Sequence, residues 1–249
     1  MKLPGFPWKP RSADLKPNQH YYDEFAGWYE RARHQGYHAL LDRLEGRLVL
    51  PHAAGARVLD AGCGTGLILR QLHPLASQAV GVDLSAGMLR QAQERGLSVV
   101  QASLTELPFA AESFDLVLSF KVLAHVEAIR GALAELARVT RPGGRLFLEF
   151  YNPNSLRYLG KLAQAGRISE QTTEREVYTR WDNPEQVRAL LPDNLELLEM
   201  HGVRVLTPMA ALHRVPLLGE LLARGEEAAV DSPLRWFGGF LVAEALRLA

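Results

Sequence analysis

The sequence has little cysteine, no long apolar run and no net charge, and each lack excludes a class of protein. Cys63 is the one cysteine among 249 residues, so an internal disulfide is impossible and a reducing cytoplasm is the expected location. No uncharged run approaches the ~20 residues of a membrane-spanning helix. The N-terminal stretch lacks the apolar segment of a signal peptide. We therefore expect a soluble cytoplasmic protein with no transmembrane segment.

The charge balance argues against nucleic acid as a partner. Lys and Arg together number 28, and so do Asp and Glu, whereas phosphate binding normally concentrates basic residues. The eight histidines are scattered, and no Cys or His pair has the spacing of metal ligands. No metal site is expected.

The chain suits one large domain with insertions. Apolar residues at helical spacing follow an irregular, proline-rich start. We expect an arm over 1–19 and a domain over 20–249, made of a helical lid (20–52), a core (56–151) and two cap insertions (152–182 and 207–235).

Short apolar runs alternate with helical patterns along the core. The predicted strands are 57–62, 79–84, 97–103, 113–120 and 145–151, followed by 195–206 and 237–249. Strands separated by helices favour a parallel sheet covered on both faces. Right-handed crossovers then make it doubly wound. The predicted fold is a Rossmann-like α/β sheet of seven strands, with helical insertions as a cap.

The stretch "VLDAGCGTGLI" places three glycines between a strand and a helix. Bare backbone there lets a ligand approach the main chain, with helix amides facing it. Asp60, against this loop, opposes a pyrophosphate but suits an ammonium or sulfonium group. Asp83, at the tip of the second strand, can hold both hydroxyls of a ribose. The ligand is therefore interpreted as a nucleoside with a positively charged appendage. S-adenosylmethionine fits this description better than NAD does.

Four motifs, "VLDAGCGTG", "GVDLSAGML", "LPFAAESFDLVLS" and "RVTRPGGRLFLEFYNP", resemble the class I S-adenosylmethionine-dependent methyltransferases in order and spacing. The similar branch includes the ubiquinone/menaquinone-type and many other small-molecule enzymes. The resemblance covers residues 20–155 well and the C-terminal third loosely. It implies methyl transfer by in-line displacement to a small or medium organic acceptor, with S-adenosylhomocysteine as product.

The resemblance also implies roles for individual residues. The methionine portion of the cofactor would contact Asp60, Ala61, Gly62, Cys63, Gly64 and Gly66. Asp83 would hold the ribose, and Leu84, Met88, Ser103 and Leu104 would surround the adenine. Ser103 stands where the family often has Asp. The sulfonium end would face Phe120 and Lys121, under a tyrosine lid from Tyr21, Tyr22 or Tyr29.

The acceptor side is less defined. His125 is a candidate general base, or a histidine packed under the cofactor, and both interpretations stay open. Lys121 is either solvated or holds an anionic acceptor. The apolar residues of 212–222 are core, or else an apolar acceptor groove or membrane contact. Two other functions also remain: a cofactor-binding accessory or regulatory protein without transferase activity, and an NAD-linked oxidoreductase.

Overall fold

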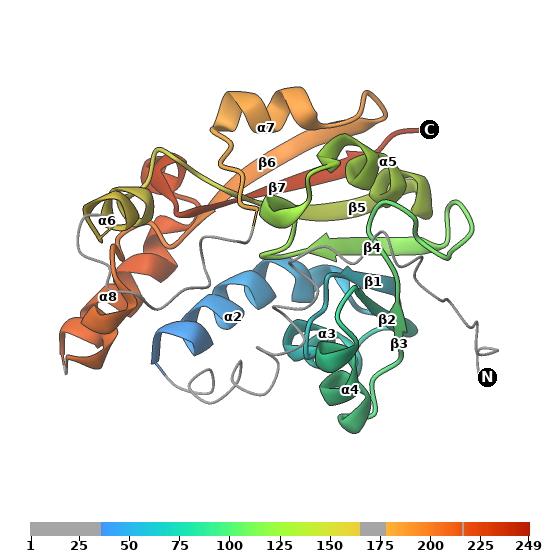
Figure 1. Ribbon diagram of the computed structural model, residues 1–249, viewed down its shortest axis with the longest axis horizontal. Helices are drawn as coiled ribbons and strands as arrows, with labels where there is room; N and C mark the ends of the chain where they lie inside the picture. Colours follow the sequence, from blue (N-terminus) through green and yellow to red (C-terminus); the bar gives the residue numbers. More distant parts are fainter. Residues whose placement is uncertain (1–35, 165–177, 216) are drawn as a thin grey trace.

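The computed structural model describes residues 36–164, 178–215 and 217–249. The predicted arm and the lid tyrosines Tyr21, Tyr22 and Tyr29 lie outside these ranges. Within them the chain forms a seven-stranded sheet in the order β3-β2-β1-β4-β5-β7-β6 (Figure 1). The strands are β1 (Arg57–Ala61), β2 (Gln78–Asp83), β3 (Val99–Gln101), β4 (Phe114–Ser119), β5 (Thr140–Tyr151), β6 (Leu195–Val203) and β7 (Phe240–Arg247).

The first five strands are parallel, and β7 runs antiparallel between β5 and β6. One face carries α2 (Gly36–Val49), α3 (Leu67–Leu72) and α4 (Ala86–Glu94); the other carries α5 (Ile129–Val139) and α7 (Pro184–Leu190) (Figure 1). The predicted doubly wound, Rossmann-like sheet with helices on both faces is confirmed.

Alternating side chains of the strands divide the core into two layers. On β5, Phe147 packs in the layer of α2 and α3, whereas Leu146 and Leu148 pack in the layer of α5 and α7. This alternation follows from the two-residue repeat of a strand. Because both faces are covered, the central strands read as nearly continuous apolar runs.

The strand order reverses direction between β1 and β4, which places a topological switch point there. In open parallel sheets, ligands bind at such a point, beyond the carboxyl ends of the strands. The glycine loop follows β1, and Phe120 and Lys121 follow β4. The fold therefore directs both predicted segments to one edge.

The insertions supply helices at this edge. The first holds α6 (Leu156–Gln164), and the second holds η3 (Ala210–Arg214), α8 (Leu218–Ala229) and η4 (Pro233–Phe237). Two single turns, η1 (Leu50–His52) and η2 (Leu123–His125), complete the described helices. Figure 1 shows α6 and α8 beyond the ends of the parallel strands.

The start of β5 and the end of α3 differ from the prediction, whereas the predicted cap of α4 is confirmed. β5 begins at Thr140, five residues before the prediction, and its pairing with β4 shifts register between Phe114 and Leu116. The Pro142–Gly144 turn is thus an irregularity inside the strand, where a Cβ on Gly144 would lie 3.1 Å from the Asp115 carbonyl. α3 ends at Leu72 rather than at 76, since Pro74 has no N–H to continue it. Ser85 caps α4 as predicted, accepting the Met88 N–H at 3.1 Å.

Candidate functional site

The glycine loop is fixed to β2 by its backbone. The N–H groups of Gly62 and Cys63 both donate to the Val82 carbonyl, at 2.6 and 2.9 Å. Gly62, Gly64 and Gly66 have φ of 87°, 54° and 79°, in the left-handed region that favours glycine. A Cβ on Gly62 would lie 2.1 Å from Val122 Cγ2, whereas one on Gly64 would meet nothing within 4 Å. Gly62 therefore serves packing, and Gly64 presents bare backbone to open space.

Asp83 connects the glycine loop after β1 to the start of α4. Its Oδ2 accepts the Gly64 N–H and its Oδ1 accepts the Ser85 N–H, both at 2.9 Å. The carboxylate thus joins the glycine loop to the start of α4. This is the position predicted for a ribose-binding acid.

The predicted adenine residues lie at the neighbouring strand ends. Leu84 directly follows β2, and its carbonyl accepts from Gln101 Nε2 at 2.9 Å. Met88 and Leu104 are buried. The Ser103 hydroxyl bonds the Thr105 hydroxyl at 2.7 Å and accepts the Thr105 N–H at 3.2 Å. The Ser103 hydroxyl is therefore engaged within its own turn. The contact of Gln101 with Leu84 was not predicted.

A cavity of about 50 Å³ lies against the glycine loop. Its lining brings together six residues predicted for the cofactor: Asp60, Gly62, Cys63, Gly64, Phe120 and Lys121. It also includes Asp42 and Glu45 of α2, which the sequence analysis missed. The pattern of α2 held a signal for Glu45, because this acid stands beside Leu44 on the apolar, buried face.

The positive charge of Lys121 compensates part of the negative charge of the acids that line this cavity. Its ammonium lies 2.7 Å from Glu45 and 3.3 Å from Asp42. The backbone N–H of Lys121 donates to Glu149 Oε1 at 3.1 Å. Glu149 is fully buried, and its Oε2 has no hydrogen-bond partner. Burial, then the charge of Glu45, raises the pKa of Glu149 well above its usual value. Lys121 is thus held by carboxylates rather than solvated.

Asp60 is a buried carboxyl group among other acids. Burial, reinforced by the charge of Asp83, raises its pKa to about 7. A ligand with an ammonium or sulfonium group supplies the opposite charge that this site calls for, whereas a pyrophosphate would add to the repulsion. Burial also raises the pKa of the Cys63 thiol well above its usual value, which disfavours a nucleophilic thiolate. The residues present fit S-adenosylmethionine.

His125 contacts Tyr151 beyond β4. Its Nδ1 lies 2.9 Å from the Tyr178 carbonyl oxygen, which only accepts, so Nδ1 is the protonated nitrogen. Burial lowers the pKa of His125, and the neutral ring leaves Nε2 as an acceptor, 3.4 Å from the Tyr151 hydroxyl. In this arrangement His125 Nε2 can accept a proton from the Tyr151 hydroxyl, which can in turn accept one from a bound acceptor molecule.

An aromatic wall stands beside this pair. It consists of Tyr151, Tyr158, Trp181 and Phe240. Ring centroids are 5.2 Å apart for Tyr151 and Phe240, 5.5 Å for Tyr151 and Trp181, and 4.8 Å for Tyr158 and Trp181. The wall joins the end of β5, the start of β7 and the first insertion.

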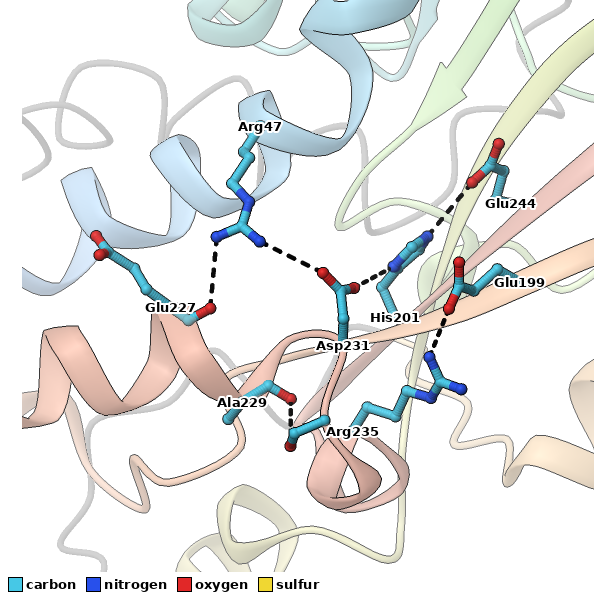
Figure 2. Close-up of polar contacts among 9 residues, drawn as sticks. Arg47, Glu199, His201, Glu227, Ala229, Asp231, Arg235 and Glu244 are labelled. Atoms are coloured by element: carbon cyan, nitrogen blue, oxygen red, sulfur yellow. Dashed lines mark hydrogen bonds and ion pairs between the residues drawn. The ribbon is translucent and has the colours of Figure 1, made fainter.

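A second polar cluster lies away from this edge, on β6 and β7. Candidate ligand atoms of Glu199, His201 and Glu244 fall within 4.8 Å of one another. Figure 2 shows their partners: Asp231 bonds His201 Nδ1 at 2.7 Å, and Arg235 holds Glu199 at 2.6 Å. Arg145 also contacts Glu244. Since arginines already hold both glutamates, we interpret the cluster as an ion-pair network.

Comparison with known proteins identifies relatives of the chain. Residues 59–148 match a family described as a methyltransferase domain. The chain is 32% identical, over 172 residues, to a ubiquinone biosynthesis O-methyltransferase of Hahella chejuensis, with 66% of this chain and 71% of that protein covered. It is 44% identical, over 103 residues, to a demethylmenaquinone methyltransferase of Mycobacterium sp. (strain KMS). That match covers 41% of this chain and 44% of the relative, so it spans less than half of that protein.

Solved structures share the architecture. A methyltransferase of Thermotoga maritima, described as S-adenosylmethionine-dependent and as a possible histamine N-methyltransferase, superimposes with a TM-score of 0.63. The match covers 92% of this chain and 98% of that one, at 22% identity. At this identity the similarity concerns the fold, since one fold carries many functions.

Proposed function

The chain belongs to the class I S-adenosylmethionine-dependent methyltransferases, and from this premise we propose that it methylates a small or medium organic acceptor of the quinone-precursor type. The observation that carries methyl transfer is the acidic cavity at the switch point, bounded by Asp60, Gly64 and Lys121, which suits the positive groups of the cofactor. Two of the relatives are named as a demethylmenaquinone methyltransferase and a ubiquinone biosynthesis O-methyltransferase. Membership of the same branch supports a similar acceptor for this chain.

The residues around the loop would hold the cofactor. Gly64 would let the methionine portion lie against the backbone, because a side chain there would fill the open space. Asp60 would face its positive groups, and Asp83 the ribose hydroxyls. Leu84, Met88, Ser103 and Leu104 would border the adenine. The bound cofactor supplies an electrophilic methyl group, and the protein contributes alignment and exclusion of water.

The acceptor would approach from the side of His125 and Tyr151. A hydroxyl acceptor must lose its proton on methylation, and His125 Nε2 is a neutral base within 3.4 Å of the Tyr151 hydroxyl. Tyr151 would pass the proton or orient the ring. Lys121, held by Glu45, would fix the floor of the site.

The two insertions would form the acceptor cap. Their helices carry exposed leucines, including Leu159 of α6 and Leu221 of α8, 60% and 68% exposed. The apolar residues of 212–222 are thus largely surface rather than core. These leucines support an apolar acceptor or contact with a membrane surface. Among the described helices, none has the length and apolar character that crossing a bilayer requires. The cytoplasmic location stays a prediction.

Product formation tests the proposal. Purified protein is incubated with S-adenosylmethionine and a panel of catechols and hydroquinones, and S-adenosylhomocysteine is quantified by mass spectrometry. We expect acceptor-dependent product from wild type and none from Gly64→Val, whose side chain would occupy the cofactor's place. Gly131→Ala is the matched control, because a Cβ on this helical glycine meets nothing within 4 Å.

The same experiment distinguishes a methyltransferase from an accessory protein and from an oxidoreductase. Cofactor binding without product from any ring acceptor would instead favour an accessory protein. Binding of NAD in place of the adenosyl ligands would favour the oxidoreductase.

A further inference from the structure

Arg157 has an unusual position in the aromatic wall. It lies in the first turn of α6, and its guanidinium carbon sits 4.0 Å from the Tyr151 ring centroid, 4.5 Å from Phe240 and 5.0 Å from Trp181. Stacking of this kind fixes the plane of a guanidinium and leaves its N–H groups for an in-plane partner.

One of these donor atoms has no partner among the described residues. Arg157 Nη1 is buried and has no hydrogen-bond partner. A buried charged donor without an acceptor is costly. This cost is offset when a bound ligand supplies the missing hydrogen-bond acceptor.

A second orphan lies in the same region. Tyr37, at the start of α2, is 7% exposed, and its hydroxyl has no hydrogen-bond partner. Burial raises the pKa of Tyr37, while the charges of Arg204 and Arg157 oppose this rise. Tyr37 therefore stays protonated as a donor, and its ring centroid lies 5.0 Å from the guanidinium carbon of Arg204.

The backbone is arranged to admit two arginines here. Gly239 precedes β7, and a Cβ on it would come 3.1 Å from Arg157 and 3.2 Å from Arg204. Arg204 is satisfied by the carbonyls of Thr207 and Pro208, at 3.0 and 2.8 Å. Arg157 is thus the guanidinium left with an unused donor.

The position borders the proposed reaction site. Arg157 stacks on Tyr151, whose hydroxyl faces His125, and its charge also acts on Glu149, which binds the Lys121 backbone. An acceptor ring lying along the wall would bring its polar substituent to Arg157.

We infer that Arg157 and Tyr37 form an oxyanion-binding subsite, which selects flat acceptor rings carrying a carboxylate or a comparable anionic oxygen. This inference rests on the proposed function. The guanidinium and the phenol would both donate to the oxyanion, and the aromatic wall would hold the ring. A carboxylate accepts two donors from different directions, so it satisfies both orphan groups at once.

The test compares two rings of equal shape. 3,4-Dihydroxybenzoate and 3,4-dihydroxybenzamide differ in the charge of one substituent, and their binding to the protein saturated with S-adenosylhomocysteine is measured by calorimetry. We expect wild type to bind the acid at least about tenfold more tightly than the amide, as for a charge-assisted hydrogen bond.

Variants locate the preference. Arg157→Met should reduce it to within about twofold, Tyr37→Phe should reduce it in part, and Arg157→Lys should retain part of it. Lys161→Met, which removes another charge of α6 that faces Trp181, should leave it unchanged. A structural arginine would lower the melting temperature when replaced. If Arg157 instead serves to bind a ligand, its replacement should leave the melting temperature of the ligand-free protein unchanged or raise it.

The inference would be overturned if wild type bound the acid and the amide equally, or bound neither. It would also be overturned if the preference for the acid survived in Arg157→Met. Methylation of the two rings is scored separately. Wild type that binds the acid through Arg157 but never forms S-adenosylhomocysteine would support the subsite and contradict the proposed function. Methylation of both rings with equal affinity would do the reverse.

Discussion

Individual side chains at the switch point carry charges that are unusual for a buried site. Asp60 is 4% exposed and shares its surroundings with Asp83 and Glu45, which both raise its pKa. Lys121 compensates in part. A cationic ligand would relieve this repulsion, so binding and protonation are linked.

This linkage predicts a pH-dependent affinity. With its pKa at about 7, Asp60 binds a proton more tightly in the folded protein than when unfolded, so the ligand-free protein loses stability as pH rises from about 4 to 7. Pairing with a cation requires the ionised form. Affinity for S-adenosylmethionine should therefore rise about tenfold from pH 5 to pH 6 and level off above pH 7.

Calorimetry across this range checks the prediction, with Asp60→Asn as the control. The variant should bind more weakly and show a flat profile. A flat wild-type profile would mean that Asp60 does not pair with the ligand's charge.

At the scale of elements, the glycine loop separates packing from binding. Gly62→Ala would force a Cβ into Val122 at a positive φ, and overpacking of this kind costs about 1–3 kcal/mol. Gly64→Ala meets open space and carries mainly the left-handed backbone cost, about 1–2 kcal/mol. We expect Gly62→Ala to lower the free energy of unfolding more, and Gly64→Ala to lose more cofactor affinity. Urea unfolding and calorimetry on both variants test this; a reversed order would contradict it.

The second insertion is held to the β6 side of the sheet by a buried acid. Glu226 of α8 is 1% exposed and accepts the N–H groups of Val205 and Leu206, at 2.7 and 3.0 Å. Glu226→Gln offers one oxygen for two donors, so about 1–3 kcal/mol of stability should be lost. Arg47→Met, which removes the exposed pair with Asp231 shown in Figure 2, should cost less than about 1 kcal/mol. Equal losses in urea unfolding would show that Glu226 does not anchor the second insertion.

The limits of sequence-based prediction follow from how far apart contacting residues lie in the chain. The strand, the glycine loop and Asp83 fall within one short stretch and follow local rules, so the sequence predicted the sheet and the loop. The Lys121–Glu45 pair joins residues 76 positions apart. Arg157, in a polar insertion, meets Phe240 through the antiparallel pairing of β5 and β7. No local pattern encodes that pairing, so the contact of Arg157 with Phe240 emerged only from the fold, whereas His125 and the two insertions had been predicted for the acceptor side.

At the scale of the whole molecule, the proposed function divides the edge of the sheet into a half that would bind the cofactor and a half that would bind the acceptor. Strands β1 to β4 contribute backbone and acids, whereas β5, β7 and the insertions contribute aromatic rings and Arg157. The first half suits a positively charged nucleoside and the second a flat polar ring. Tyr151 and Lys121, at the ends of neighbouring strands, mark the boundary where transfer would occur.

Thermal unfolding with separate ligands tests whether this edge of the sheet binds S-adenosylmethionine. S-adenosylmethionine, S-adenosylhomocysteine and NAD are each added at about 100 times the expected dissociation constant, which stabilises by about 2.7 kcal/mol. For a chain of this size we expect the melting temperature to rise by about 5–10 °C with the two adenosyl ligands. The rise should be lost in Asp83→Ala, and NAD should cause none. A rise with NAD alone would contradict the assignment of this edge to S-adenosylmethionine.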